Sequence, residues 1–324
     1  KDKDLKINAS NMCTEIMLPS KEDWSFVCNL SSMNVLYYDE WKNTDAVETM
    51  VYFLDAVMSE FINRLEEMRD SGQNDKTTTF RFLKRAYNFA TANRAIGLGV
   101  LGWHSYLQSK MIPVETKEAS RLNIEIFQKI NELAMAASRK MATEYGEPSL
   151  MEGTGMRHAT VLAVAPTTSS AFILGQVSQS IEPIWSNCYV KDIDKMKVTI
   201  KNPTLVALLE SKGENTNYNW ERIRDADGSV QHLGFLTLHE KDVFRTFAEI
   251  DQMTLIEQAA DRQKFIDQGQ SLNLMVSPDV SPKDINAMYM RAWKLGIKSL
   301  YYQHSMSAAQ QLIRKQLACQ SCEA

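Results

Sequence analysis

An amide, a thiol and a carboxylate lie close together near the start of this sequence. They are Asn11, Cys13 and Glu15, and a second cysteine, Cys28, follows 15 residues after the first. Alternate residues of an extended segment point to the same side, so these three side chains are expected to face one ligand as hydrogen-bond donor, sulfur and base. The alternative is that Cys13 is a small buried apolar residue, although a carboxylate beside it would be a poor core residue.

A run of hydroxyl residues follows an apolar stretch at 159–165. It begins after Pro166, ends before Ala171, and consists of Thr167, Thr168, Ser169 and Ser170. Such residues often cap the start of a helix, where free backbone N–H groups also bind phosphate. Because the run stands at the carboxyl end of a predicted parallel strand, we predict that 166–171 binds a phosphate, with capping alone as the alternative.

Two pairs of residues stand near the end of the chain, one aromatic and one of cysteines. Adjacent aromatic residues such as Tyr301 and Tyr302 usually pack in a sheet, and neighbours in a strand face opposite sides. Cys319 and Cys322 form a CxxC motif, typical of half a zinc site or of a redox pair. The sequence has no second CxxC or histidine cluster to complete a zinc site, so we favour a mobile dithiol that exchanges disulfides.

A glycine motif and a fifth cysteine have simpler interpretations. Residues 97–102 match GxGxxG, but the segment before them is helix-like, whereas a dinucleotide site follows a strand. We therefore expect close backbone packing at a helix-to-helix junction there. Cys188 has no evident partner and is expected to be a small buried residue.

Composition excludes several classes of protein. The 324 residues are 44% hydrophobic and 23% charged, with a net charge of −4, which is typical of a globular protein and argues against a basic nucleic-acid groove. No apolar run reaches the roughly 20 residues that span a bilayer, and the charged start lacks the apolar region of a signal peptide. Five irregularly spaced cysteines favour the cytoplasm, where disulfides are rare.

Hydrophobic periodicity predicts an α/β protein. Helices are expected at 46–70, 80–95 and 117–145, where apolar residues recur at helical spacing. Strands are expected at 25–30, 159–165, 271–276 and 299–302, and 190–240 is expected to be irregular, a helical insertion or a surface excursion. Strands alternating with long helices indicate a parallel sheet or barrel, but these strands are too few to close a barrel.

Together these stretches resemble the C-terminal half of the large, catalytic subunit of class I ribonucleotide reductases, most of all the phage versions. The shared stretches occur in family order and are Asn11–Glu15, Cys28–Ser31, Arg94–Gly102, Ala165–Ser170, Ile181–Pro183, Arg262–Gln268, Leu300–Tyr302 and the Cys319/Cys322 pair. The resemblance implies that residues 1–312 form the helix-rich C-terminal half of a ten-stranded α/β barrel, with Cys13 on a finger loop inside it. Residues 313–324 would form a flexible redox-active tail.

The resemblance also implies a radical mechanism. Cys13 would carry a transient thiyl radical that takes the 3′ hydrogen of a ribonucleotide, expected to be a diphosphate. Glu15 would act as the base on the 3′ hydroxyl and Asn11 would hydrogen-bond the substrate, whose diphosphate would lie on 166–171. Cys28 would be one of two cysteines that supply electrons. Tyr301 and Tyr302 would relay the radical, and the tail pair Cys319/Cys322 would reduce the resulting disulfide.

Several partners follow from the same resemblance. The chain itself would bind no cofactor, because a metal-containing small (beta) subunit supplies the radical and a thioredoxin or glutaredoxin recharges the tail. A separate N-terminal fragment of the large subunit would contribute the first half of the barrel and the partner of Cys28. The chain alone is therefore expected to be inactive and to expose an apolar edge. We expect no membrane or nucleic-acid partner, and a location in the cytoplasm, that of the host if the protein is viral.

Three rival interpretations remain. A cobalamin-dependent, class II reductase shares the cysteine loop and the phosphate loop, but it has no need of Tyr301 and Tyr302. A non-catalytic assembly subunit would have had no reason to keep Asn11, Cys13 and Glu15. A thiol oxidoreductase that uses only the tail cysteines would leave that same loop without a purpose.

Overall fold

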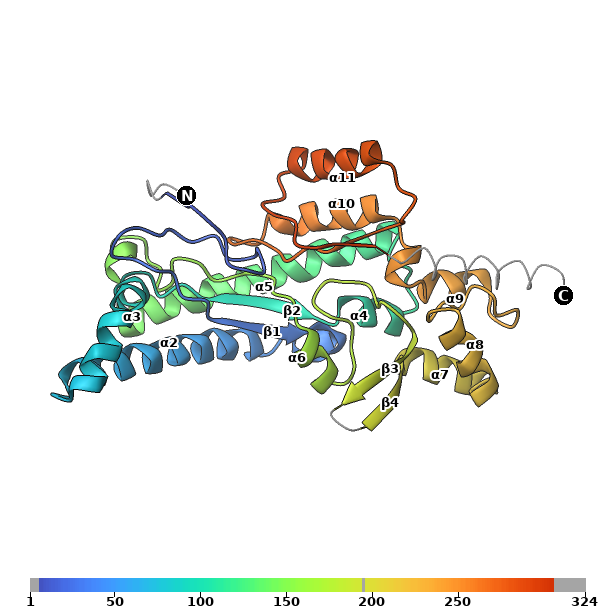
Figure 1. The fold of residues 1–324 in the computed structure, drawn as a ribbon, viewed down its shortest axis with the longest axis horizontal. Helices are drawn as coiled ribbons and strands as arrows, with labels where there is room; N and C mark the ends of the chain where they lie inside the picture. Colours follow the sequence, from blue (N-terminus) through green and yellow to red (C-terminus); the bar gives the residue numbers. More distant parts are fainter. Residues whose placement is uncertain (1–5, 194–195, 306–324) are drawn as a thin grey trace.

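The computed structural model describes residues 6–193 and 196–305 (Figure 1). The predicted tail and its two cysteines lie outside the described residues. The helices are α1 (Tyr38–Trp41), α2 (Ala46–Asp70), α3 (Asn74–Asn93), α4 (Trp103–Ser109), α5 (Lys117–Tyr145), α6 (Thr168–Ile173), α7 (Pro203–Ser211), α8 (Asn217–Asp225), α9 (Leu238–Val243), α10 (Gln252–Gln263) and α11 (Pro282–Lys294). The strands are β1 (Leu30–Asn34), β2 (Gly97–Leu101), β3 (Cys188–Ile193), β4 (Met196–Lys201), β5 (Leu274–Val276) and β6 (Gln303–Ser305).

The two longest helices begin and end where the periodicity predicts. In α2 the buried side chains recur every three or four residues and form one apolar stripe, namely Val47, Val51, Leu54, Met58, Ile62 and Leu65. At the start of α5 the Thr116 hydroxyl accepts a hydrogen bond from the amide of Ala119, and Gly146 follows its last turn at φ 81°. The third predicted helix, α3, is longer than expected, because it starts at Asn74 rather than at residue 80.

Parallel main-chain pairing joins four segments side by side. β1 pairs with β2, and Leu98 of β2 also bridges to Leu162 on its other side. Val164 in turn bridges to Gln270. The order is therefore β1, β2, the 161–164 segment and the 269–271 segment, which is a parallel α/β arrangement of the kind predicted. Beyond these segments, β5 pairs in parallel with β6.

The strand predictions are only partly right: 271–276 contains β5, 25–30 overlaps β1 at Leu30 alone, and 299–302 ends just before β6. The apolar stretch 159–165 is buried as expected, yet it makes isolated bridges instead of a regular strand. Regular pairing starts later than predicted at β1, β5 and β6. The GxGxxG segment is a buried strand, β2, and not a helix-to-helix junction. Glycine is needed there because a Cβ on Gly99 would lie 2.4 Å from the carbonyl oxygen of Ala163.

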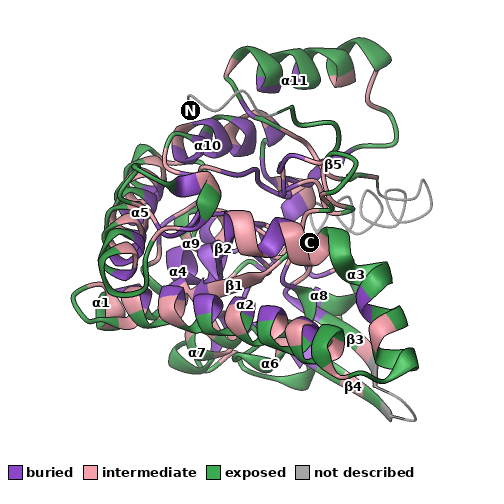
Figure 2. Cartoon of the chain, turned by 90° about the vertical axis from the view of Figure 1, so that its left-hand side faces the viewer, coloured by how far each residue is buried: buried purple, intermediate pink, exposed green. Residues whose placement is uncertain are grey.

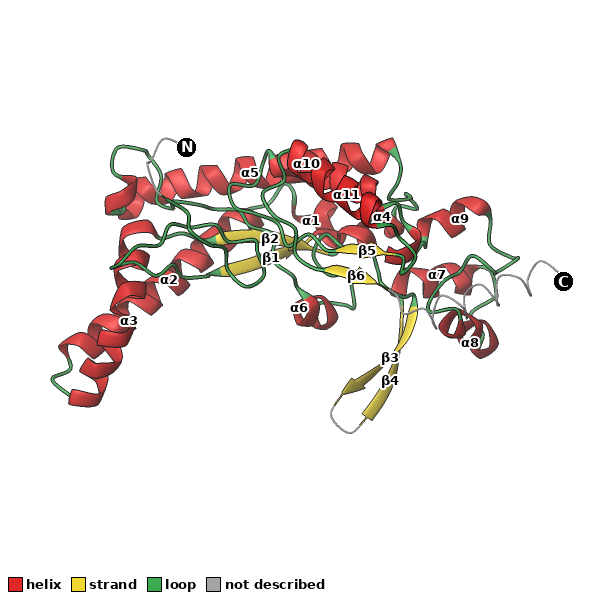
Figure 3. Cartoon of the chain, turned by 45° about the horizontal axis from the view of Figure 1, so that its top comes forward, coloured by secondary structure: helices red, strands yellow, loops and turns green. Residues whose placement is uncertain are grey.

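The long helices cover the paired segments. Helix α2 packs against α3 and α5, and α5 packs against α10. Apolar side chains of α2, α5 and α10 form one core with the paired segments, while Phe89 and Ala90 of α3 lie in two smaller clusters. Figure 2 shows that the long helices are buried on one side and exposed on the other. In Figure 3 the strands β1, β2, β5 and β6 run through the middle of the molecule with helices around them.

The region 190–240 is more regular than predicted. It contains the antiparallel β3–β4 hairpin and the helices α7 and α8, which share a second, smaller core with α9. Cys188 is 2% exposed within this core, which confirms the prediction of a small buried residue. Within the described part of the chain, no helix is both long and apolar enough to cross a membrane.

Candidate active site

Cys13 lies in a tight turn. The amide of Thr14 donates to the carbonyl of Asn11 at 3.2 Å, and Thr14 has a left-handed φ of 65°. The Asn11 side-chain oxygen accepts a hydrogen bond from the amide of Ile16 at 3.0 Å, closing the turn from the inside. The three polar residues therefore come together through a turn, not through the alternation of an extended strand.

Cys28 joins this turn and completes a cluster of two thiols, an amide and a carboxylate. The side chain of Asn11 lies beside the Cys28 sulfur, and Glu15 and Cys13 are close enough to change the pKa of its thiol. Partial desolvation, followed by the negative charges of Glu15 and Cys13, raises the pKa of the Cys28 thiol to about 11. Cys28 is thus held in its protonated form at neutral pH.

The segment 269–271 holds the turn from the other side. The Ser271 hydroxyl lies 2.6 Å from the carbonyl oxygen of Cys13 and 2.9 Å from Oε2 of Glu15, and Glu15 is only 1% exposed. The amide of Gly269 donates to the carbonyl of Glu15 at 2.6 Å. A Cβ on Gly269 would lie 3.0 Å from that carbonyl oxygen, so glycine permits the close approach.

The two tyrosines stack on each other beside Cys13. Their ring centroids are 4.0 Å apart and the rings are tilted by 39°. The side chains of Tyr302 and Cys13 lie close enough to Tyr301 to interact with its hydroxyl, and these interactions, together with partial desolvation, raise the pKa of its phenol. The prediction that neighbours face opposite sides is wrong here, because both residues precede β6 and are not in a regular strand. The structure therefore gives an unbroken path of contacts from Tyr302 through Tyr301 to Cys13.

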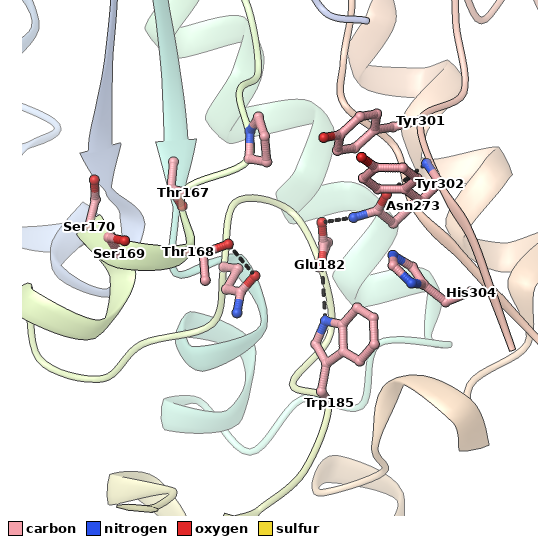
Figure 4. A pocket seen from close by; sticks show the side chains of 12 residues that line it. Thr167, Thr168, Ser169, Ser170, Glu182, Trp185, Asn273, Tyr301, Tyr302 and His304 are labelled. Carbon is pink, nitrogen blue, oxygen red and sulfur yellow. Dashed lines mark hydrogen bonds between the residues drawn. The ribbon is translucent and has the colours of Figure 1, made fainter. Parts of the chain in front are cut away.

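A pocket of about 440 Å³ separates the hydroxyl run from the tyrosine pair. Pro166 and the four hydroxyl residues line one wall, and Tyr301 and Tyr302 line the other (Figure 4). Thr167 precedes α6 without capping it, which argues against the capping alternative. Its hydroxyl instead accepts from the amide of Ser180 at 2.8 Å. Ala171 does not line the pocket, because it is buried against Leu101 and Val177.

Five further residues of this pocket were not predicted from the sequence. One of them, Gln179, accepts a hydrogen bond from the Thr168 hydroxyl at 3.0 Å. Glu182, Trp185, Asn273 and His304 lie on the wall that carries the tyrosines (Figure 4). Glu182 is 3% exposed, and burial raises the pKa of its carboxyl. It stands in the stretch Ile181–Pro183 that carried part of the resemblance, and a carboxylate between two apolar residues was the one signal that pointed to it.

No group of three or more metal-ligating side chains occurs among the residues that the structure describes. Cys319 and Cys322 fall outside the described residues.

Comparisons with known proteins agree with this geometry. The sequence matches the family described as "Ribonucleotide reductase, barrel domain" over residues 1–154 and 149–303. It is 38% identical to the ribonucleoside-diphosphate reductase large subunit of Invertebrate iridescent virus 6, over 93% of this chain and 30% of that protein. It is 40% identical to the putative ribonucleoside-diphosphate reductase large subunit of Frog virus 3, over 93% of this chain and 51% of that protein.

A solved structure is also similar. The alpha subunit of the class Id ribonucleotide reductase of Actinobacillus ureae superposes with a TM-score of 0.86 at 51% identity, over 98% of this chain and 56% of that one. The chain thus spans from about a third to just over half the length of these relatives. The predicted fold class is confirmed, since the described elements form part of the α/β barrel of these enzymes. The chain belongs to the ribonucleotide reductase barrel-domain family.

Proposed function

We propose that this chain is the C-terminal part of the catalytic subunit of a class I ribonucleotide reductase, and that it reduces ribonucleoside diphosphates to deoxyribonucleotides in the cytoplasm. The observation that carries the proposal is the line of contacts from Tyr302 through Tyr301 to Cys13. Such a line suits a radical that arrives from outside. Residues 1–312 would form the barrel part and residues 313–324 a redox tail.

The first chemical step is a hydrogen transfer to a tyrosyl radical. A radical on Tyr301 takes the hydrogen of the Cys13 thiol, which leaves a phenol on Tyr301 and a thiyl radical on Cys13. The thiyl radical then takes the 3′ hydrogen of the ribonucleotide and becomes a thiol again. Glu15, which is buried and held by Ser271, accepts the proton of the 3′ hydroxyl as general base. Asn11 supports the substrate from the same turn.

The second step removes the 2′ hydroxyl as water. At its end the Cys13 thiol returns the hydrogen to the 3′ carbon and becomes a thiyl radical again, and Glu15 returns the proton to the 3′ oxygen. Cys28 and a second thiol of the large subunit give up two electrons and two protons and become a disulfide. A neutral thiol supplies a proton as well as an electron, and the raised pKa keeps Cys28 in that form. Cys319 and Cys322 would reduce the disulfide by thiol exchange, and a thioredoxin or glutaredoxin would restore them.

The hydroxyl run would bind the diphosphate of the substrate. Thr168, Ser169 and Ser170 are exposed on the wall of the pocket that faces the tyrosines, and hydroxyl and backbone N–H groups are the usual partners of a phosphate. Pro166 and Thr167 would shape this wall. Ala171, which was predicted to belong to the phosphate site, does not take part, because it is buried away from the pocket.

The tyrosine pair also favours class I over the cobalamin-dependent alternative. A stack that leads from Cys13 to a 54% exposed Tyr302 suits an oxidant held by a separate small subunit that contains a metal. The remaining part of the large subunit would complete the barrel. These partners belong to the proposal and agree with the large-subunit and alpha-subunit names of the relatives.

The proposal is tested by a reduction assay on the assembled large subunit that contains this chain. A ribonucleoside diphosphate and a dithiol are supplied with a radical-bearing small subunit in one reaction and with adenosylcobalamin in another. The proposal requires that deoxyribonucleotide forms in the reaction with the small subunit and not in the reaction with adenosylcobalamin. Tyr302→Phe should abolish product formation, because phenylalanine cannot carry the radical. Turnover that needs only adenosylcobalamin would assign the chain to class II.

A further inference from the structure

Glu182 occupies an unusual place for a carboxylate. It lies on the pocket wall beside Tyr302 and is only 3% exposed. Its two oxygens accept hydrogen bonds from Nδ2 of Asn273 at 2.6 Å and from Nε1 of Trp185 at 3.1 Å (Figure 4). Burying a carboxyl is costly unless such donors satisfy it. Nothing in the chemistry proposed above uses this group, so its retention in the wall needs another explanation.

Asn273 links Glu182 to the outer tyrosine. While its nitrogen donates to Glu182, its oxygen accepts the backbone amide of Tyr302 at 2.9 Å. An amide side chain has one accepting end and one donating end. The carboxylate therefore fixes which end faces Tyr302, because a reversed amide would point its donor at the Tyr302 N–H and its acceptor at the carboxylate. The carbonyl of Tyr302 accepts from the amide of Leu274 at 2.9 Å, so both sides of its backbone are held.

Trp185 provides a second connection. Its ring stands edge-to-face against His304, with centroids 4.6 Å apart, and against Phe247, with centroids 5.6 Å apart. The His304 ring in turn lies 5.5 Å from the ring of Tyr302. Glu182 fixes the indole by accepting its N–H, and the indole supports the imidazole that covers Tyr302. One carboxylate thus controls the backbone of Tyr302 and the packing next to its ring.

We propose that Glu182 is a positioning residue of the radical relay, which holds Tyr302 in its stack on Tyr301 through Asn273 and Trp185. This inference rests on the proposed function, since it concerns the relay that function requires. Transfer between two groups depends steeply on their geometry, and a displacement of about 1 Å can cost about 10²-fold in rate. The 4.0 Å stack therefore needs a support that does not itself react.

Two substitutions grade the loss of this support in the assembled large subunit with its small subunit. Glu182→Leu removes both acceptors and leaves two buried donors unpaired. Glu182→Gln keeps one oxygen for Asn273 but turns an NH2 group toward Trp185. We expect kcat to fall about 10²-fold in Glu182→Leu and less in Glu182→Gln, with KM for the ribonucleoside diphosphate changed by less than about twofold.

A spectroscopic measurement separates positioning from general damage. With 3-aminotyrosine at position 302, the trapped radical is counted by electron paramagnetic resonance after substrate is added. Its yield should fall in the same order as kcat. Asn219→Leu is the matched control, because Asn219 of α8 is a buried amide whose nitrogen donates to the carbonyl of Glu214 at 2.9 Å, within a helix that packs in the second core. It should lower stability and leave kcat and radical yield unchanged.

The outcomes are distinct. A wild-type kcat in Glu182→Leu overturns the inference, as does an equal loss of radical yield in Asn219→Leu. A raised KM with unchanged kcat also overturns it, because Glu182 would then contact the substrate instead. Tyr302→Phe tests the proposed function separately. If that variant turns over, the relay itself fails, whereas an inactive Tyr302→Phe beside an unaffected Glu182→Leu removes only the role of Glu182.

Discussion

The cluster around Cys13 depends on a single turn and on one distant residue. The residue types at positions 11, 13 and 15 could be interpreted from the sequence, and the structure brings them together with Cys28. The turn that brings them together could not be predicted, because Thr14 has a left-handed φ and nothing in the sequence marks a non-glycine residue for that conformation. The contact of Asn11 with Cys28 is likewise a tertiary one, which local sequence patterns do not contain.

The raised pKa of Cys28 predicts slow alkylation. Only the thiolate reacts with iodoacetamide, and Cys28 is exposed to the reagent. With a pKa of about 11 instead of 9.0, its thiolate fraction, and hence its labelling rate, should still be rising at about pH 10. Mass spectrometry of the peptide that contains Cys28 measures this rate. A rate that levels off by about pH 10, as a thiol of pKa 9.0 would, contradicts the prediction.

Replacing Glu15 gives the control for this prediction. Glu15→Gln removes a negative charge next to Cys28, and that charge is one cause of the raised pKa. Labelling of Cys28 should therefore become faster at a given pH. Labelling that does not change would mean that the charge of Glu15 does not contribute to the raised pKa.

At the scale of elements, helices were predicted better than strands. The apolar stripes of α2 and α5 repeat over many turns, so their bounds follow from periodicity. Strand β2 escaped prediction because its glycines resemble a loop. Gly97 and Gly99 are needed because the 161–164 segment packs closely against them. This is a tertiary contact, which no local sequence pattern indicates.

The close approach at β2 predicts a large cost for one added methyl group. In Gly99→Ala the new Cβ would lie 2.4 Å from the carbonyl oxygen of Ala163, so the backbone of two paired segments must move. We expect a loss of about 1–3 kcal/mol in the free energy of unfolding, measured by urea denaturation. Gly234→Ala is the matched control, because nothing lies within 4 Å of its added Cβ. Equal effects of the two substitutions would refute the packing argument.

A buried charge cluster joins α2 to the segments that follow α3 and α5. Nε of Arg94 lies 2.7 Å from Oδ1 of Asp55 and Nε of Arg157 lies 3.0 Å from Oδ2, while the imidazole of His158 is 3.2 Å from Oδ1. Burial alone would raise the pKa of Asp55, but hydrogen bonds from His158 and Arg94 and the charges of both arginines hold it well below its usual range. Asp55 is therefore ionised at neutral pH.

This lowered pKa determines how the cluster contributes at each pH. A carboxyl whose pKa is lower in the folded state stabilises the fold above its unfolded pKa of about 3.9 and loses that contribution as the pH falls further. Asp55→Asn should cost about 3–5 kcal/mol at pH 7, because it leaves buried arginines without their partner, and less below about pH 4. Urea denaturation at pH 7 and below about pH 4 measures the loss in the free energy of unfolding. Asp70→Asn, at the exposed end of the same helix, should change little, and equal effects would contradict the account.

At the scale of the whole molecule, the sequence indicated part of a barrel, and the structure supplies the strand order. Isolated bridges at Leu162 and Val164 connect β2 to the 269–271 segment. Ser271 of that segment donates a hydrogen bond to the carbonyl of Cys13. Tyr301, which precedes β6, interacts with the Cys13 side chain. The active-site cluster thus depends on segments that are more than 250 residues apart. Such distances explain why the residue types could be recognised from the sequence while their arrangement could not.

The central claim is that Cys13 carries the reaction, and one comparison tests it most directly. Deoxyribonucleotide formation is measured for the assembled large subunit with its small subunit, a ribonucleoside diphosphate and a dithiol, in Cys13→Ala and in Cys188→Ala. Cys188 is buried in the second core, away from the site, so its variant should turn over like the wild type. Cys13→Ala should form no product. Product formation at the wild-type rate in Cys13→Ala would contradict the account.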